Sequence, residues 1–406
     1  MDAQADDQSY LDRYRTLPWW ARLRVSLGAA AAPLVRLVCR LALPAWQERP
    51  PRAFETGVQR AVLPDGGHYL GDAAIRAFED RGFTEPFDVL PRDRALALRP
   101  ELEAAIAGGE IVQGLFSELH GEERAQALAR AGITETARLR GFDRHKNVPA
   151  IRAVLNRPEI THRVASLLGP DVLLWRSQVF PRKPGGAGTR LHFATSFGTN
   201  MARARLLVPR PTFDRDPGLL NLSLWLALSD VTLRDAPLTL VPGSHRQVGN
   251  VARGAEDLSL LNTLTTADAR KLLFQFLVGS DDPDLHPMFG MVRRMLARQG
   301  LELEDRQEPV LLRAGQAVLF TSKCVHGSLP HTGDTSRFAL VARFTTPDVD
   351  VYPGSDSHFW FGKGVFPQQI RVPRERLRPE CVHGDCDDYL AAWPAPEHNR
   401  RYLERY

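Results

Sequence analysis

Residues 310–344 read VLLRAGQAVLFTSKCVHGSLPHTGDTSRFALVARF. Three runs rich in Val, Leu, Phe and Ala, at 310–312, 317–320 and 337–344, are separated by Gly, Pro, Asp and Ser. Short apolar runs bounded by such turn residues are typical of β-strands. Similar runs occur upstream, at 172–175, 220–228 and 238–241. Several short strands with this punctuation predict a β-sandwich or jelly roll.

The composition is that of an ordinary globular protein. The chain has 406 residues, of which 43% are apolar and 25% charged, enough for one large domain with elaborations or two common ones. Lys and Arg number 52 against 48 Asp and Glu, and the arginines are spread among the acids. A nucleic-acid partner is therefore not expected. The four cysteines are too few for a disulfide framework, which predicts a reducing, cytoplasmic location.

Helical patterns surround the strand-like runs. Amphipathic or capped segments occur at 73–78, 90–98, 102–107 and 151–168. Residues 250–307 form a long insertion with helical periodicity, suited to serve as a lid or a substrate wall. Strands punctuated by turns and accompanied by helices predict an α+β protein whose β core is covered by helices.

Residues 1–70 differ from the rest and are expected to form an amphipathic N-terminal extension. Between residues 17 and 46, Leu, Val and Ala are interrupted by Arg, with Trp near both ends. The longest uncharged run, 25–35, is shorter than the roughly 20 residues that cross a bilayer. This pattern predicts a helix that lies on a membrane surface or docks on a partner, or one packed on the protein's own body. The first ten residues lack the positive region of a secretory signal.

Two groups of potential metal ligands stand out. Cys381, His383 and Cys386 form a C-x-H-x-x-C motif, but no fourth ligand lies nearby, so a structural zinc is not expected. His192 follows a Gly- and Pro-rich turn, and His326 follows the strand-like run that ends at 320. A jelly roll brings such strand ends together in its mouth, where neutral imidazoles suit Fe(II), Zn or Cu. Buried structural histidines are the alternative.

Arg337 lies eleven residues beyond His326, at the start of the next strand-like run. An arginine deeper in the same barrel is suited to bind a carboxylate through paired hydrogen bonds.

From about residue 74 to 369 the chain resembles the phytanoyl-CoA dioxygenase superfamily of non-haem Fe(II)/2-oxoglutarate enzymes. The supporting segments are Asn221–Asp230, Leu238–His245 and Gly315–Arg337. Within that superfamily it most resembles the syringomycin-type halogenases, through Phe83–Asp88, Asp143–His145, Leu168–Trp175, His331–Gly333 and Val349–Pro353.

The resemblance implies a double-stranded β-helix (jelly-roll, cupin-like) core with surrounding helices, carried by a catalytic domain at 71–406. Hydroxylases of the superfamily bind iron through His-x-Asp and a distal His, but here the triplet is His192-Phe193-Ala194, and a methyl group cannot coordinate a metal. The resemblance implies that Fe(II) is held by His192, His326 and 2-oxoglutarate, with O₂ as co-substrate. Chloride then takes the place of the missing carboxylate.

The same resemblance implies roles for further residues. Arg337 would pair with the distal carboxylate of 2-oxoglutarate, assisted by Thr189 and Trp225. The halide pocket would comprise apolar or small walls and a polar network: Ala194, Phe197, Ser322, Thr199, Asn200, Ser223 and Arg343. Related halogenases carry Asn at the position of Thr199, and the adjacent Asn200 could substitute for it.

The reaction implied is halogenation, most simply chlorination, of an unactivated aliphatic carbon in a natural-product precursor. The substrate is expected to be a small molecule or an acyl group, free or tethered to a carrier protein. The basic, Trp-flanked extension indicates, as an alternative, a lipid or fatty-acyl substrate near a membrane. Two other functions fit the same residues. One is a hydroxylase that keeps water in the vacant position, and the other is a non-catalytic binding module with a degenerate site.

Overall fold

The computed structural model describes residues 15, 19–31, 33, 56, 63, 66–107, 141–193, 207–248, 306–351, 357–361, 368–372 and 377–393. The helices are α2 (Trp19–Ala30), α4 (Asp72–Arg81), α5 (Arg92–Ala107), α8 (Pro149–Leu155), α9 (Pro158–Leu168), α11 (Ser244–Val248) and α15 (Asp387–Ala391), with 3-10 turns η2 (Arg144–Lys146) and η3 (Pro217–Leu220). The strands are β1 (Phe87–Asp88), β2 (Val172–Arg182), β3 (Thr189–His192), β4 (Leu207–Pro209), β5 (Leu222–Ala227), β6 (Leu238–Leu240), β7 (Glu308–Pro309), β8 (Gln316–Thr321), β9 (His326–Ser328), β10 (Arg337–Thr345), β11 (Val349–Val351), β12 (Ser357–Phe361), β13 (Gln368–Val372) and β14 (Glu380–His383).

Two antiparallel sheets form the centre of the molecule. The larger has six strands in the order β1-β8-β5-β10-β2-β14, and the smaller has four in the order β3-β9-β6-β7. Strands β4 and β11 form a separate pair, as do β12 and β13. Between β2 and β10 the chain passes repeatedly from the larger sheet to the smaller and back. The predicted combination of helices with antiparallel β-structure is confirmed.

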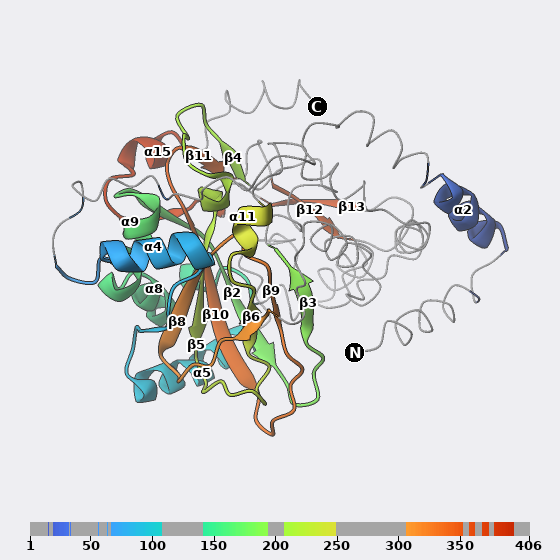
Figure 1. The fold of residues 1–406 in the computed structure, drawn as a ribbon, viewed down its shortest axis with the longest axis horizontal. Helices are drawn as coiled ribbons and strands as arrows, with labels where there is room; N and C mark the ends of the chain where they lie inside the picture. Colours follow the sequence, from blue (N-terminus) through green and yellow to red (C-terminus); the bar gives the residue numbers. More distant parts are fainter. Residues whose placement is uncertain are drawn as a thin grey trace.

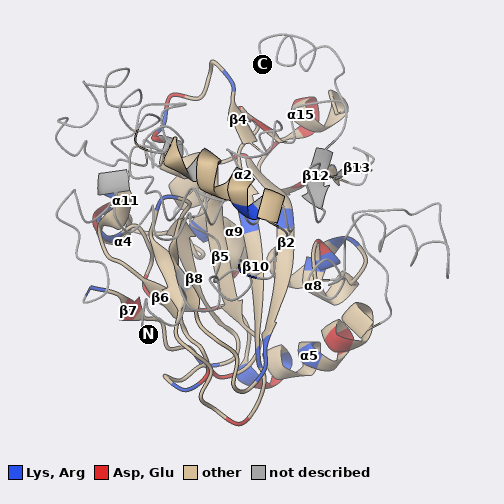
Figure 2. Cartoon of the chain, turned by 90° about the vertical axis from the view of Figure 1, so that its right-hand side faces the viewer, with Lys and Arg blue, Asp and Glu red and all other residues tan. Residues whose placement is uncertain are grey.

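The alternation of side chains along the strands separates the two faces of the larger sheet. On β10, Leu340 and Ala342 belong to a hydrophobic cluster shared with helices α4, α5, α8 and α9. Ala339 and Val341, on the opposite face, belong to a second cluster with residues of β5, β6 and β8. Because successive strand residues point to opposite faces, helices cover one side of this sheet and the smaller sheet covers the other (Figures 1 and 2).

The helical stretch predicted at 151–168 is divided in two. Helix α8 ends at Leu155, and α9 begins at Pro158 after Asn156 and Arg157. Proline disfavours the helical conformation of the residue before it, and Arg157 is accordingly extended. Pro158 is well placed at the first position of α9, where no backbone N–H is needed.

The segments at both ends of the predicted core are only partly described. Leu63 is buried in the helix-side core cluster, and Tyr69 and Leu70 pack against it, so the last residues of the extension cover the domain itself. Apart from residues 306 and 307, the predicted helical insertion at 250–307 lies outside the described residues. Among the helices that are described, none combines the length and the apolar character needed to cross a membrane.

Two histidines are buried away from the candidate site. In His145, Nδ1 lies 2.7 Å from Oγ of Ser177, and in His245, Nε2 lies 2.9 Å from the carbonyl oxygen of Glu79. Burial lowers the pKa of each imidazole to about 4. Both side chains are therefore neutral in the folded protein at neutral pH.

We expect acidification to weaken the fold through these two histidines. The unfolded chain, with ordinary histidine pKa values near 6.5, binds more protons than the folded chain between about pH 6.5 and 4. The free energy of unfolding should therefore fall by about 2 kcal/mol per histidine between pH 7 and pH 5, measured by urea denaturation. The variant His145→Gln/His245→Asn should lose most of this pH dependence, and an unchanged dependence would refute the explanation.

Candidate active site

The two histidines predicted as metal ligands lie side by side because β3 and β9 are neighbours in the smaller sheet. His192 and His326 are direct antiparallel partners. Their ring centroids are 4.2 Å apart, and the ring planes are inclined by 54°. Two imidazoles that bind one ion in adjacent positions, with metal–nitrogen bonds of about 2.1 Å, have centroids roughly 4.5 Å apart. The observed separation fits such a pair.

A bulge in β3 aims a second predicted site residue in the same direction. Thr189 pairs with Ser328 and His192 pairs with His326, so two residues of β3, Arg190 and Leu191, match the single residue Gly327 of β9. In a regular strand, Thr189 and His192 would point to opposite faces. The extra residue brings both onto the face of the sheet that also carries the side chains of Ser328 and His326.

The hydrogen bonding of His326 identifies its free nitrogen. Its Nδ1 lies 2.8 Å from the carbonyl oxygen of Cys324. A carbonyl only accepts hydrogen bonds, so Nδ1 carries the proton and Nε2 presents its lone pair. Backbone carbonyls orient metal-binding histidines in this way. Burial lowers the pKa of His326 to about 4, with a smaller contribution from the positive charge of Arg343, so the imidazole is neutral at pH 7.

The residues around this pair come from the larger sheet. Arg343 of β10 and Ser223 of β5 are direct cross-strand partners, and Ser223 is also paired with Phe320 of β8. The Phe320 ring lies 4.9 Å from the His326 ring, centroid to centroid. Ser322 is buried and donates a hydrogen bond of 3.0 Å to the carbonyl oxygen of Gly218. Sequence reasoning missed Phe320, although alternation along residues 317–320 puts it on the face opposite Leu319.

Arg337 and Trp225 form a second polar position between the sheets. Arg337 is 4% exposed, and its guanidinium carbon lies 5.2 Å from the centroid of the Trp225 ring. Among the described residues, its Nε has no hydrogen-bond partner. Burial lowers the pKa of Arg337 to about 9, and the positive charge of Arg182 acts in the same direction, while Asp235 opposes it. A buried cation next to another cation is a favourable site for an anion.

Arg182 connects this position to β3. It lies directly opposite Arg337 across the β2–β10 pairing, and its Nη2 donates a hydrogen bond of 2.5 Å to Oγ1 of Thr189. Thr189, Trp225 and Arg337 are therefore gathered around one basic position, as a carboxylate would require. Sequence reasoning missed Arg182, because its position opposite Arg337 follows from the pairing of β2 with β10.

Four of the seven predicted halide residues are not among those that the structure describes. Ala194, Phe197, Thr199 and Asn200 lie outside the described residues. Within the described part of the chain, no group of three His, Cys, Asp or Glu side chains is arranged to hold a metal ion.

A family model for phytanoyl-CoA dioxygenase (PhyH) matches residues 78–339, which is more than half of the chain. The chain belongs to the phytanoyl-CoA dioxygenase family. The matched range contains both histidines of the pair, Arg337, Trp225 and Thr189. Membership identifies the protein as an oxidoreductase of the Fe(II)/2-oxoglutarate-dependent oxygenase type.

Solved structures with related folds include several non-haem enzymes. The structure of CytC3 with Fe(II) and α-ketoglutarate is 21% identical, with a TM-score of 0.49 and coverage of 82% of this chain and 94% of that one. The non-haem monooxygenase ThoJ is also 21% identical, with a TM-score of 0.47 and coverage of 82% and 92%. The carbocyclase SnoK from nogalamycin biosynthesis is 19% identical, with a TM-score of 0.43 and coverage of 72% and 90%. A search of curated proteins found no match.

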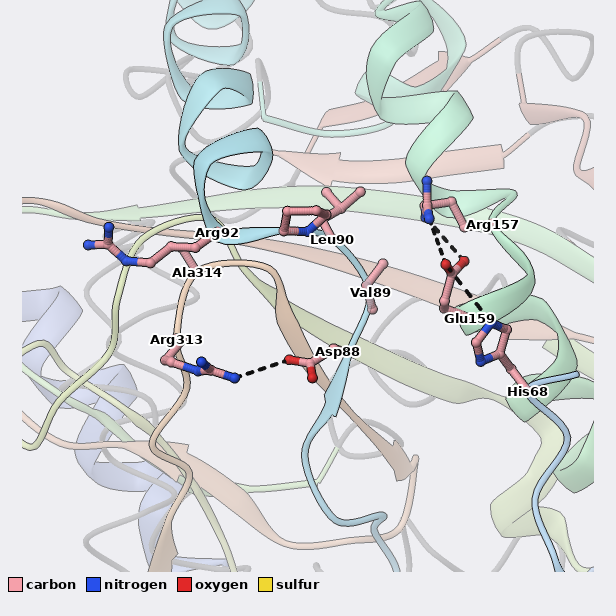
Figure 3. A pocket seen from close by; sticks show the side chains of 10 residues that line it. His68, Asp88, Val89, Leu90, Arg92, Arg157, Glu159, Arg313 and Ala314 are labelled. Carbon is pink, nitrogen blue, oxygen red and sulfur yellow. Dashed lines mark hydrogen bonds and ion pairs between the residues drawn. The ribbon is translucent and has the colours of Figure 1, made fainter.

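A cavity of about 550 Å³, drawn in Figure 3, is lined by residues that do not include the histidine pair. Val89 and Ala314 in its wall belong to the core cluster on the helix side of the larger sheet. Its charged groups already neutralise one another: Arg157 pairs with Glu159 at 2.6 Å, Arg313 with Asp88 at 3.5 Å, and Arg92 with Asp230.

The cysteine–histidine motif near the C-terminus lies on β14 and at the start of α15. Both ring nitrogens of His383 are engaged: Nε2 lies 2.8 Å from the hydroxyl oxygen of Tyr69, and Nδ1 lies 2.5 Å from the carbonyl oxygen of Pro170. The Cys381 and Cys386 sulfurs are 2.8 Å apart. The arrangement gives His383 a structural role that joins residue 69 to the end of α9.

Proposed function

We propose that the protein is an Fe(II)/2-oxoglutarate-dependent halogenase that chlorinates an unactivated aliphatic carbon. The observation that carries the proposal is a pair of in-register imidazoles whose first member is followed, two residues later, by Ala194 where hydroxylases have an iron-binding Asp. Two neutral nitrogen ligands leave the metal one negative charge and one ligand short. Chloride supplies both.

The topology supports a double-stranded β-helix as the scaffold. Strands β2, β5, β8 and β10 lie in the larger sheet, and β3, β6, β7 and β9 lie in the smaller one. An antiparallel chain that alternates between two facing sheets in this way has jelly-roll connectivity. We assign residues 71–406 to this catalytic domain and residues 1–70 to an N-terminal extension.

Charge on the inner face of the barrel favours anions. Across the β2–β10 pairing, Arg182 opposes Arg337, and Arg176 opposes Arg343. Like charges directly opposite each other destabilise a sheet, and bound anions relieve that repulsion. The first pair lies beside Thr189 and suits the distal carboxylate of 2-oxoglutarate. The second pair includes Arg343, whose charge acts on His326, and suits the chloride position.

The side chains of this chain have distinct tasks in the proposed reaction. His192 and His326 hold the metal, and the Cys324 carbonyl fixes the orientation of His326. Arg337 and Thr189 orient 2-oxoglutarate, while Phe320 and Trp225 keep water from the inner face. When bound, iron and 2-oxoglutarate supply, with O₂, the oxidising power that removes hydrogen from the substrate carbon. Ser223 and Arg343 are expected to stabilise chloride through polar contacts.

An anaerobic titration tests the proposal without knowledge of the substrate. Fe(II) and 2-oxoglutarate should produce a visible absorption band with the wild-type protein, and chloride should shift that band. His326→Ala should fail to retain iron, whereas His68→Ala, which changes a half-buried histidine on the helix side, should behave like wild type. A band that forms but does not respond to chloride would favour the hydroxylase function. Absence of iron binding would favour a non-catalytic binding module.

The Thr189 hydroxyl gives a finer test of the 2-oxoglutarate position. Removing it in Thr189→Val takes away the acceptor for Arg182 and should weaken 2-oxoglutarate binding by about tenfold. Thr189→Ser retains the hydroxyl and should stay within about threefold of wild type. Titration of the absorption band with 2-oxoglutarate measures both, and equal affinities for the two variants would contradict the assignment.

For the substrate we propose a natural-product precursor, either a free small molecule or an acyl group carried by a partner protein. The small number of cysteines supports a location in the cytoplasm. The N-terminal extension would bring the protein to a membrane surface there. The protein is incubated with acyl substrates in free and in carrier-tethered form, and the products are analysed by mass spectrometry. The form whose mass increases by the replacement of hydrogen with chlorine is the substrate.

A further inference from the structure

The first described helix, α2, exposes bulky apolar side chains. Trp19, Leu23 and Leu27 are 70%, 49% and 65% exposed, and Trp20 is 47% exposed. We call these four residues the tryptophan–leucine face. Large exposed apolar groups that gather on one element mark an interaction surface, whereas single scattered ones do not.

Helical geometry collects this face on one side of α2. Successive residues turn by about 100°, so its four members fall within an arc of about 100°. Val25 lies on the other side of the helix and is fully buried, so that side faces the protein. Arg22 is exposed beside the arc. Figure 1 shows α2 at the edge of the molecule, apart from the two sheets.

The charge of the surrounding sequence has one sign. Residues 13–47 contain six Arg and no Asp or Glu, although the whole chain carries a formal charge of only +4. Basic residues close to an anionic membrane surface are attracted to it by the negative charge of the lipid headgroups. Charge complementarity therefore points to a negatively charged partner.

We propose that α2 binds in the plane of an anionic lipid bilayer, with the tryptophan–leucine face inserted at the boundary between headgroups and acyl chains. A projecting helix with a bulky apolar arc and adjacent arginines matches such an interface. Tryptophan is particularly suited to this depth, since one part of its ring is apolar and its N–H reaches water. A protein partner would instead need a groove shaped to receive the helix. The proposal is independent of halogenation.

Sedimentation of the full-length protein with vesicles tests this inference. The protein should bind vesicles of phosphatidylcholine mixed with phosphatidylglycerol, and bind vesicles of phosphatidylcholine alone much more weakly. Leu23→Glu/Leu27→Glu should lower the partition coefficient by about 100-fold. The matched control, Leu233→Glu/Leu311→Glu, changes two exposed leucines outside α2 by the same charge and should bind like wild type.

Iron and 2-oxoglutarate binding serve as the folding readout and should be unchanged in both variants, so a failed halogenase assay leaves this test intact. Equal vesicle binding by the two double variants would overturn the proposal. The proposal would also be overturned if the wild-type protein did not bind anionic vesicles but bound an acidic acyl carrier protein through the tryptophan–leucine face. The partner of α2 would then be a protein and not a bilayer.

Discussion

Ala194→Asp is expected to remove the response of the iron site to chloride. The introduced carboxylate supplies the negative charge and the oxygen ligand that the two-histidine site lacks, so chloride meets both an occupied position and electrostatic repulsion. The apparent chloride affinity should fall by at least about 100-fold. Iron and 2-oxoglutarate should still bind, and any product formed should be hydroxylated in place of chlorinated. The chloride-dependent shift of the absorption band measures the effect before a substrate is known.

Ala194→Gly is the matched control, because it alters the same position without adding a ligand. It should keep a chloride-dependent shift close to that of wild type. If Ala194→Asp retained the chloride shift, the halide would bind elsewhere, and the proposed replacement of a carboxylate by chloride would be wrong.

Arg337→Gln is expected to weaken 2-oxoglutarate binding by about 100- to 1,000-fold, because a bidentate ion pair with the distal carboxylate is lost. The buried guanidinium has no hydrogen-bond partner for Nε among the described residues and lies against Trp225, so its removal should leave the fold largely intact. Titration of the absorption band gives the affinity, and thermal unfolding checks the fold.

Arg337→Lys keeps a positive charge but loses the planar fork, so its affinity should fall between those of wild type and Arg337→Gln. Arg182→Gln should have a smaller effect than Arg337→Gln, since Arg182 is already bonded to Thr189. The opposite order would move the carboxylate site from Arg337 to Arg182.

Much of the fold could be predicted from local patterns. Short apolar runs bounded by turn residues predicted strands at 317–320 and 337–344, and the structure has β8 and β10 there. The strand predicted at 310–312 was placed less accurately. In the structure, β7 at 308–309 pairs with β6 of the smaller sheet, and Leu312 forms only an isolated bridge with Val231. Boundaries of this kind depend on which neighbouring strand is available, which no local pattern contains.

The candidate site was predictable in its residue types and less so in its partners. The distance along the sequence from His326 to Arg337 indicated a ligand and a carboxylate-binding group on successive strands. Arg182 was missed because its position opposite Arg337 follows from the pairing of two strands far apart in the chain. Phe320 was missed because its contact with His326 follows from the packing of one sheet on the other. The roles of all the predicted site residues stay predictions, including those of Ala194, Phe197, Thr199 and Asn200.

By itself, the sequence determined the chemistry available: two imidazoles, an arginine, and an alanine in place of a carboxylate, because these are properties of single residues and short spacings. Only the tertiary structure decided that the two imidazoles could meet. A bulge in β3 turns Thr189 and His192 to the same face, and the pairing of β3 with β9 brings His192 to His326. Likewise, opposed arginines on β2 and β10 concentrate positive charge that is dispersed along the chain. Such registers arise from the packing of distant segments, and therefore lie beyond any local pattern of residues.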